Sequence, residues 1–309
     1  MATTTNITTT YAGEFAGKYV SAALLSGKTL AENLITIKPN IKFKEVMKKV
    51  ATTDLVKDAT CDFDPTSTLT LTERILQPEE FQVNLQLCKK DFRNDWEAVS
   101  MGFSAYDNLP PSFADFLIAH AADKVAQKME QNIWNGTNAN AGEFDGFKTT
   151  LLADGDVVDV AAVGGGVDSS NVVAQLGRIV DVIPSPVYGT EDLFIYVSSN
   201  IYRAYVRALG GFASNVGAAG TDNKGTQWFN GGALTYDGIN IVLASGLAAN
   251  TAVAAQKSNL FFGTGLLNDQ NEVKVIDMAD IDGSQNVRVV MRFTAGIQHA
   301  IGSDIVLYS

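Results

Sequence analysis

The chain of 309 residues has few of the side chains on which catalysis usually depends. It contains only two histidines, His120 and His299, and two cysteines, Cys61 and Cys88. A nucleophile–base system needs a Ser or Cys, a His and usually a carboxylate, so only two positions could hold the base. No Gly-x-Ser-x-Gly motif is present. Two isolated cysteines fit a reducing compartment, and a Cys61–Cys88 disulfide is not favoured.

Signals for export and for membrane insertion are also missing. Residues 1–6 lack both the basic stretch and the apolar stretch of a signal peptide. No run of 18 apolar residues exists, so no segment has the length that a membrane-spanning helix needs. We therefore expect a soluble protein that is made in a cytoplasm.

Basic residues are scarce outside the first 50 positions. That segment holds seven lysines against three glutamates, a net charge of +4, so the remainder carries −15 of the overall −11. An acidic body argues against a dedicated nucleic-acid-binding protein, because affinity for phosphates requires clustered cations. The basic segment fits either a solvated arm or contact with an acidic partner, including a second copy of the chain.

The hydrophobic content of 46% is enough to build a substantial core, in one large domain or two smaller ones. Apolar spacing predicts a long helix over 112–135, which ends at Gly136; the span 113–135 is roughly 34 Å long. Residues 69–75 and 81–87 alternate apolar and polar side chains, which predicts strands with one apolar face. Such strands suit a ribbon that lies over another surface, such as a neighbouring subunit.

Further elements follow from the same periodicities, and together they predict an α+β fold with helices and antiparallel strands segregated. Further helices are expected at 171–183 and at 201–209, the latter capped by Asn200. The remaining strands are expected at 192–198, around 238–243, and at 260–263, 273–278, 287–293 and 297–308.

Several carboxylate groups invite a metal-site hypothesis, but none fits a known loop. Asp280 and Asp282 resemble part of a calcium loop, yet that register places Met278 and Val289 at the first and twelfth ligand positions. The other groups are predicted to be turn residues or a repulsive row. They are Asp154, Asp156 and Asp159; Asp62 and Asp64; and Asp54, Asp58 and Asp62.

Two glycine-rich segments do not match a phosphate-binding loop. They are residues 164–166 and 210–232, and the second contains a single lysine, Lys224. We predict hinges or turns there. No catalytic, cofactor-binding or metal-binding residue is predicted, no cofactor is expected, and His120 and His299 are interpreted as structural or surface residues. A cytoplasmic hydrolase that uses His299 or an aspartate cluster stays open as a reading from another class.

Segments spread over most of the chain resemble, in the same order, the major capsid proteins of tailed double-stranded DNA bacteriophages, which have the Hong Kong 97-type capsid fold. The order of the segments carries the resemblance more than any single motif does. The segments are Phe81–Trp96, Ile133–Thr137, Phe144–Phe147, Phe194–Tyr205, Tyr236–Ile241, Phe293–Gln298 and Asp304–Tyr308.

The resemblance implies how the chain is divided. Residues 1–40 would be an N-terminal arm, and 41–77 an extended hairpin loop that lies on the next subunit. Residues 78–184 would form a peripheral domain with the spine helix 112–135. Residues 185–245 would form an axial domain, and 246–309 would return to the peripheral domain.

The resemblance also implies a structural function without catalysis. The chain would self-assemble into hexamers and pentamers of an icosahedral capsid that encloses phage DNA, in a virion assembled in the bacterial host cytoplasm. Implied partners are other copies, a separate scaffolding protein, a portal protein, decoration proteins where present, and packaged DNA contacted non-specifically, with no membrane. An acidic body would let the DNA slide along the inner wall. An encapsulin-like nanocompartment shell shares the fold and is the alternative, although the threonine-rich residues 1–10 favour a phage.

Overall fold

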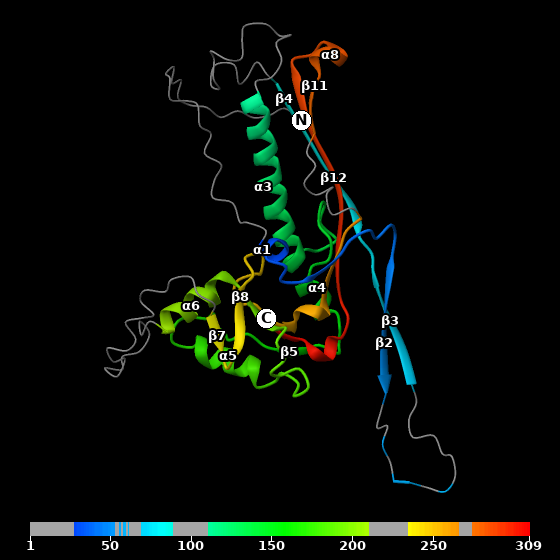
Figure 1. Cartoon of the computed structure of the whole chain (residues 1–309). Coiled ribbons are helices and arrows are strands. Elements are labelled where there is room, and N and C mark those ends of the chain that lie inside the picture. Colours follow the sequence, from blue (N-terminus) through cyan, green and yellow to red (C-terminus); the bar gives the residue numbers. More distant parts are fainter. Residues whose placement is uncertain are drawn as a thin grey trace. The chain divides into compact units, whose positions relative to one another are not determined.

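The computed structural model describes residues 28–52, 56, 58–59, 61, 69–88, 111–209, 234–265 and 274–309 (Figure 1). The chain forms two compact units. Unit 1 comprises residues 1–26, 80–128 and 266–294, and unit 2 comprises residues 27–79, 129–265 and 295–309. None of the helices in the described part of the chain combines the length and the apolar character that a membrane crossing needs.

The elements follow one another as a mixture of helices and strands. The α-helices are α1 (Lys28–Ala31), α3 (Pro111–Asn135), α4 (Phe147–Leu152), α5 (Val172–Val180), α6 (Ser199–Leu209) and α8 (Ala279–Asp282). Short 3₁₀ helices cover Lys257–Asn259 and Gly302–Asp304. The strands are β1 (Thr36–Lys38), β2 (Glu45–Thr52), β3 (Leu69–Leu76), β4 (Glu79–Cys88), β5 (Val158–Val160), β6 (Leu193–Val197), β7 (Leu234–Tyr236), β8 (Ile239–Leu243), β9 (Ala252–Gln256), β10 (Leu260–Gly263), β11 (Lys274–Asp277), β12 (Asn286–His299) and β13 (Val306–Tyr308).

In unit 1, β12 pairs with β4 and, in antiparallel register, with β11. The alternation predicted for 287–293 is confirmed, because four apolar side chains are buried while the arginines between them are exposed. The buried set is Val287, Val289, Met291 and Phe293. On one face the rings of Phe81 and Phe293 lie 5.6 Å apart, and on the other Arg288 Nε donates to Gln86 Oε1 at 3.2 Å. The pleat therefore separates an apolar from a polar face, as the sequence pattern predicts.

In unit 2, six strands form a mixed sheet in the order β5-β13-β9-β6-β8-β7. β6 runs parallel to β8 and β13 runs parallel to β5, whereas the other neighbours are antiparallel. The α+β class is confirmed, but the expectation of antiparallel strands alone is wrong. A parallel pair needs a crossover connection, and α6 lies in the connection between β6 and β8.

A buried hydrophobic cluster of unit 2 joins this sheet to α5 and α6. It includes Leu176 and Ile179 from α5, Ile201 from α6, and Ile195 and Val197 from β6. Each of these side chains is at most 2% exposed. The helix α5 places its apolar residues at helical spacing on one stripe, and burying that stripe against the sheet stabilises the helix.

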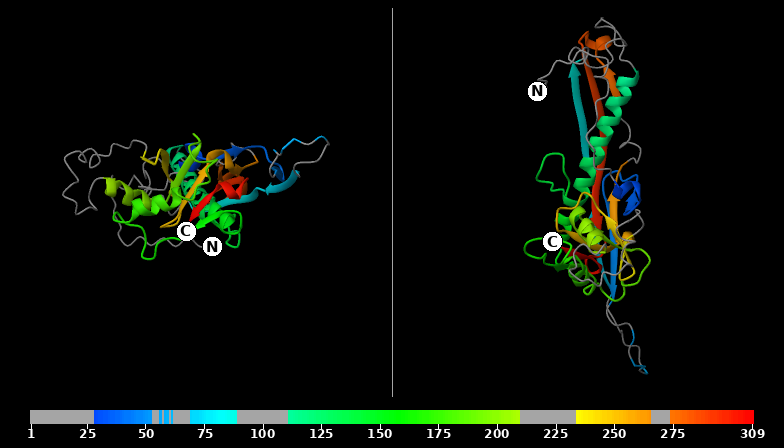
Figure 2. Two further views of the ribbon diagram at one scale, coloured as in Figure 1. Left: turned by 90° about the horizontal axis from the view of Figure 1, so that it is seen from below. Right: turned by 90° about the vertical axis from the view of Figure 1, so that its left-hand side faces the viewer.

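The long helix α3 is continuous through its whole length (Figure 2) and ends where the sequence predicts, at Gly136. The Gly136 N–H donates to Asn132 O at 3.0 Å, and Gly136 O accepts from Gly146 N at 3.0 Å and from Thr149 Oγ1 at 2.8 Å. A Cβ atom at position 136 would lie 2.2 Å from Phe144 O, so only glycine fits this exit.

An aromatic group packs against the C-terminal end of α3. The ring of Trp134 is fully buried, with its centroid 5.4 Å from that of Phe147 and 5.1 Å from that of Tyr196. Trp134 Nε1 donates to Thr29 Oγ1 at 2.9 Å, and Thr29 donates to the Glu130 carboxylate through its N–H at 3.1 Å and its hydroxyl at 2.6 Å. These contacts attach α1 to α3.

Asn200 is not the helix cap that the sequence predicts. The helix α6 begins at Ser199, so Asn200 lies in its first turn. Asn200 Nδ2 donates to Asn250 Oδ1 at 2.6 Å, and Asn200 Oδ1 accepts from the Asn250 N–H at 3.0 Å. Asn250 has a φ of 60°, a left-handed conformation that asparagine tolerates well. The amide of Asn200 therefore holds a turn that precedes β9, which local sequence does not reveal.

Candidate functional site

The strands β2 and β3 form a two-stranded antiparallel hairpin that pairs with no other described strand (Figure 1). The register places Val46 opposite Ile75, so these two share one face of the hairpin with Leu69 and Leu71, on either side of Lys48 and Glu73, which lie opposite each other. Their exposed fractions are 45%, 43%, 63% and 62%, respectively. We call this set the apolar hairpin face. An isolated two-stranded hairpin is marginally stable in water, so an exposed face of this kind points to an interaction surface.

The base of the hairpin is anchored in unit 2 by both apolar and polar contacts. Leu76 at the end of β3 is fully buried, and its side chain lies close to Gly263. Gln298 Nε2 donates to Ile75 O at 3.1 Å. Glu45 at the start of β2 pairs with Lys38 at the end of β1. The hairpin is therefore buried and hydrogen-bonded to unit 2 at Leu76 and Ile75, whereas Leu69 and Leu71 farther along β3 are exposed.

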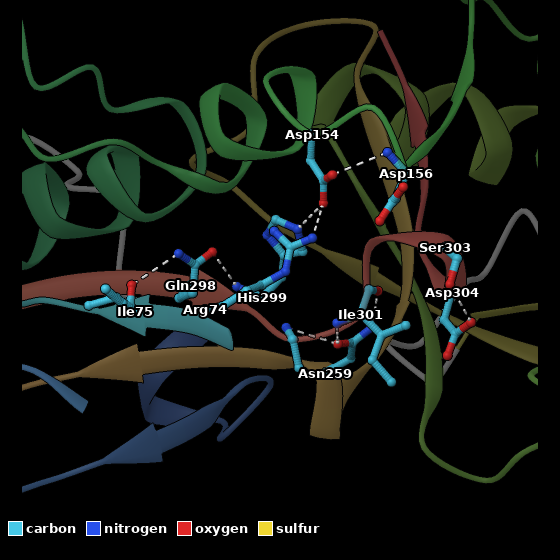
Figure 3. Close-up of polar contacts among 11 residues, drawn as sticks. Arg74, Ile75, Asp154, Asp156, Asn259, Gln298, His299, Ile301, Ser303 and Asp304 are labelled. Atoms are coloured by element: carbon cyan, nitrogen blue, oxygen red, sulfur yellow. Dashed lines mark hydrogen bonds and ion pairs between the residues drawn. The ribbon is translucent and has the colours of Figure 1, made fainter. Parts of the chain in front are cut away.

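Arg74, Asp154 and His299 converge beside this base (Figure 3). Arg74 Nη2 donates to Asp154 Oδ2, and His299 Nε2 lies 2.8 Å from the same oxygen. The other carboxylate oxygen accepts from the Asp156 N–H at 3.1 Å. Arg74 lies on β3, Asp154 follows α4, and His299 ends β12, so three segments meet at one carboxylate.

The electrostatics of this group favour a charged aspartate and a neutral histidine. Burial by itself raises the pKa of Asp154, but hydrogen bonds from His299, the Asp156 N–H and Arg74 outweigh it and lower the pKa from 3.8 to about 2. Burial lowers the pKa of His299 below 6.5 and the Arg74 charge acts in the same sense, although the hydrogen bond to Asp154 opposes them. At neutral pH the imidazole is therefore uncharged, and Nε2–H donates to the carboxylate.

Acidification is expected to lower the free energy of unfolding in two stages. His299 resists protonation in the folded state, so its contribution is complete above pH 6.5 and is lost as the pH falls below that value. Asp154 contributes stability above pH 3.8 that is lost as the pH falls to about 2, and this interval corresponds to about 2 kcal/mol. Urea unfolding at stepped pH measures both stages.

The control for this pH profile is Asp181→Asn, because Asp181 is an exposed aspartate elsewhere in unit 2. Asp154→Asn should remove the stage between pH 3.8 and 2, whereas Asp181→Asn should keep it. A profile of Asp154→Asn that parallels the wild type across this range would contradict the assignment.

The hydrolase hypothesis draws support from one contact and lacks the others it needs. The structure does bring His299 to an aspartate, Asp154, as a base and its orienting carboxylate would be. The ring is fully buried, however, and no described residue makes a hydrogen bond to its Nδ1. A hydrolase needs a nucleophile or an activated water at that second nitrogen, and no described Ser or Cys is placed there.

The other sequence candidates separate into turn residues and positions outside the described residues. Gly283 ends α8 with a φ of 71°, and Ser284 N donates to Asp282 Oδ1 at 2.9 Å. Asp282 is therefore a turn residue. Gly165 and Gly166 have φ values of 94° and 90°, which confirms the predicted turn. Residues 210–232 and positions 54, 62 and 64 lie outside the described residues.

The remaining sequence candidates are His120, Cys61 and Cys88. His120 lies half-buried on α3. Cys61 is exposed and Cys88 is half-buried, each as a free thiol. Within the described residues, no group of three or more His, Cys, Asp or Glu side chains is arranged to hold a metal ion. Sequence reasoning missed the convergence on Asp154, because Arg74 and His299 lie 80 and 145 residues from it along the chain.

No protein-family model matches this chain, and no curated protein matches it in sequence. Solved structures do match it. The capsid of a native GTA particle matches with a TM-score of 0.63 and 14% identity, over 94% of this chain and 93% of that chain. The capsid of the cyanophage P-SCSP1u matches with a TM-score of 0.55 and 14% identity, over 96% and 91%. A chain from Mycobacterium phage Che8 matches with a TM-score of 0.53 and 13% identity, over 100% and 98%. The resemblance to phage capsid proteins is confirmed at the level of the fold.

Proposed function

We propose that this chain is the shell-forming subunit of a tailed-phage capsid, which assembles into hexamers and pentamers around double-stranded DNA. The observation that carries the proposal is the apolar hairpin face. A chain with the fold of capsid structures presents Leu69 and Leu71 to solvent at 63% and 62% exposure, on a ribbon that pairs with no other described strand. A second copy that covers this face would bury it, and symmetry would repeat that contact around the shell.

The roles that we propose for the segments of the chain follow the resemblance to capsid proteins. Residues 1–40 act as an N-terminal arm, and 41–77 as the extended hairpin that lies on the next subunit. The helix α3 acts as the spine of a peripheral domain formed by 78–184 and 246–309. Residues 185–245 form the axial domain, which faces a symmetry axis. Scaffolding, portal and decoration proteins are the expected partners during assembly in a bacterial cytoplasm.

We infer a structural rather than a catalytic role. The pair His299–Asp154 is the one described arrangement in this chain that resembles part of a catalytic site, and Arg74 already neutralises the aspartate. A buried, charge-compensated group of this kind is typical of a structural contact. Replacing His120 and His299 in turn should therefore leave any hydrolytic activity of an extract that contains the protein unchanged.

Electron microscopy of negatively stained protein tests the proposal directly. The purified chain is examined alone and after co-expression with the products of neighbouring genes. Closed shells, or rings of five and six subunits, are the expected result. A neighbouring portal or terminase gene would favour a phage, whereas a cargo-enzyme gene would favour the encapsulin-like alternative. A monodisperse monomer under every condition would contradict both.

A further inference from the structure

The hairpin depends on its base for any fixed direction. In the described part of the chain, no hydrogen bond or ion pair joins residues 46–49 or 69–73 to anything outside the hairpin. The ladder between β2 and β3 holds the strands to each other, but it does not orient them relative to the rest of unit 2. Among the described residues, the contacts that can set the direction of the hairpin therefore lie at its base.

Asp154 lies at this base. It joins β3 through Arg74, the C-terminal end of β12 through His299, and its own turn through the Asp156 N–H (Figure 3). The side chain of Asp154 is 14% exposed, that of Arg74 is 26% exposed, and that of His299 is fully buried. In so little water the charge-assisted hydrogen bonds are directional and strong, so the carboxylate fixes the guanidinium in place.

The surrounding backbone is also shaped to leave room for this carboxylate. A Cβ atom at Gly302 would lie 2.4 Å from Asp154 Oδ2, the oxygen that Arg74 and His299 share. Because both partners already hold that oxygen, it cannot move aside freely. Gly302 is therefore required for the contact and not only for the local turn.

We propose that Arg74, Asp154 and His299 form a clamp that sets the direction in which the β2–β3 hairpin leaves unit 2. The clamp holds the apolar hairpin face in one position before any partner covers it. A contact surface that is already held in its bound position loses less conformational entropy on association. The clamp would therefore increase the affinity of the free subunit for its neighbour. The consequence for assembly rests on the proposed function, whereas the effect on the free subunit does not.

A distance measurement between two spin labels tests the clamp on the full-length chain. Native cysteines are removed by Cys61→Ser and Cys88→Ser, and labels are attached at Lys48→Cys on the hairpin and Asp181→Cys after α5. Both label positions are exposed and both lie in unit 2. The labelled chain without further substitutions, called the parent, is expected to give one narrow distance distribution by pulsed electron paramagnetic resonance.

Variants of the clamp are then compared with a matched control on the same strand. Arg74→Gln and Asp154→Asn should lose the single narrow peak and give a broad or divided distribution. Glu73→Gln removes one charge from an exposed neighbour and should keep the narrow peak. Gly302→Ala should act like the clamp variants because it displaces Asp154.

The outcomes separate the clamp from the proposed function. If Arg74→Gln keeps its circular dichroism spectrum and a peak as narrow as that of the parent, the clamp is overturned. If Asp154→Asn does not fold, Arg74→Gln and Gly302→Ala decide, because the Arg74 side chain is partly exposed and its loss leaves no cavity in the core. A wild-type chain that never assembles would overturn the proposed function, yet the label distances would still decide the clamp.

Discussion

Replacing Trp134 by alanine is expected to lower the free energy of unfolding by about 3–5 kcal/mol, as is typical when a large buried aromatic side chain is removed. The indole is fully buried between Phe147 and Tyr196, at centroid distances of 5.4 Å and 5.1 Å. Its N–H also donates to Thr29 Oγ1, so the substitution would loosen α1 together with the core. Because domains are commonly stable by about 5–15 kcal/mol, this loss should be visible as a large shift in the urea midpoint.

Two variants separate the packing of Trp134 from its hydrogen bond. Trp134→Phe keeps a buried ring and loses the N–H, so it should cost about 1 kcal/mol from the unmade hydrogen bond, plus a smaller packing loss. Leu152→Ala, at a leucine that is 52% exposed, should cost much less than Trp134→Ala. Urea unfolding followed by circular dichroism avoids the fluorescence change that removing an indole causes. If Trp134→Ala had the same urea midpoint as Leu152→Ala, the aromatic group would not contribute to the stability of the core.

The sequence predicts those elements whose cause is local. The helix α3 is predicted to within one residue, because its apolar spacing continues up to Gly136, where Phe144 O leaves no room for a side chain. The alternation over 287–293 likewise gives both the strand and its buried face. In β12, and in the part of α3 whose side chains are described, the residues that favour the element also bury its apolar side, so propensity and packing agree.

The parts that the sequence does not predict depend on long-range partners. The C-terminal strand β13 lies between β5 and β9, and no periodicity within Val306–Tyr308 identifies either neighbour. The Asn200–Asn250 pair and the convergence on Asp154 have the same origin, since each joins positions at least 50 residues apart. Asp154 is predicted as a turn residue, and its Oδ1 does accept from Asp156 N, but its second oxygen serves a contact that only the fold creates.

Replacing Leu69 and Leu71 together by serine is expected to abolish shell assembly while leaving the subunit folded. Both side chains are more than 60% exposed in the subunit, so their loss removes little buried area from the fold. Burial of one leucine contributes about 1.5–3 kcal/mol, and each 1.4 kcal/mol changes an association constant about tenfold. Two leucines at a contact that recurs around a closed shell therefore have an effect that is multiplied over many subunits.

The control for the hairpin is Leu152→Ser, which removes a leucine that is also more than half exposed but lies outside the apolar hairpin face. Sedimentation velocity and electron microscopy measure assembly, and urea unfolding of the free subunit measures stability. The expected pattern is normal unfolding in all three proteins, shells from the wild type and from Leu152→Ser, and free subunits from Leu69→Ser with Leu71→Ser. Shells at wild-type yield from the double variant would show that the apolar hairpin face is not the assembly contact, because a buried face of this size cannot lose two leucines without a measurable change in association.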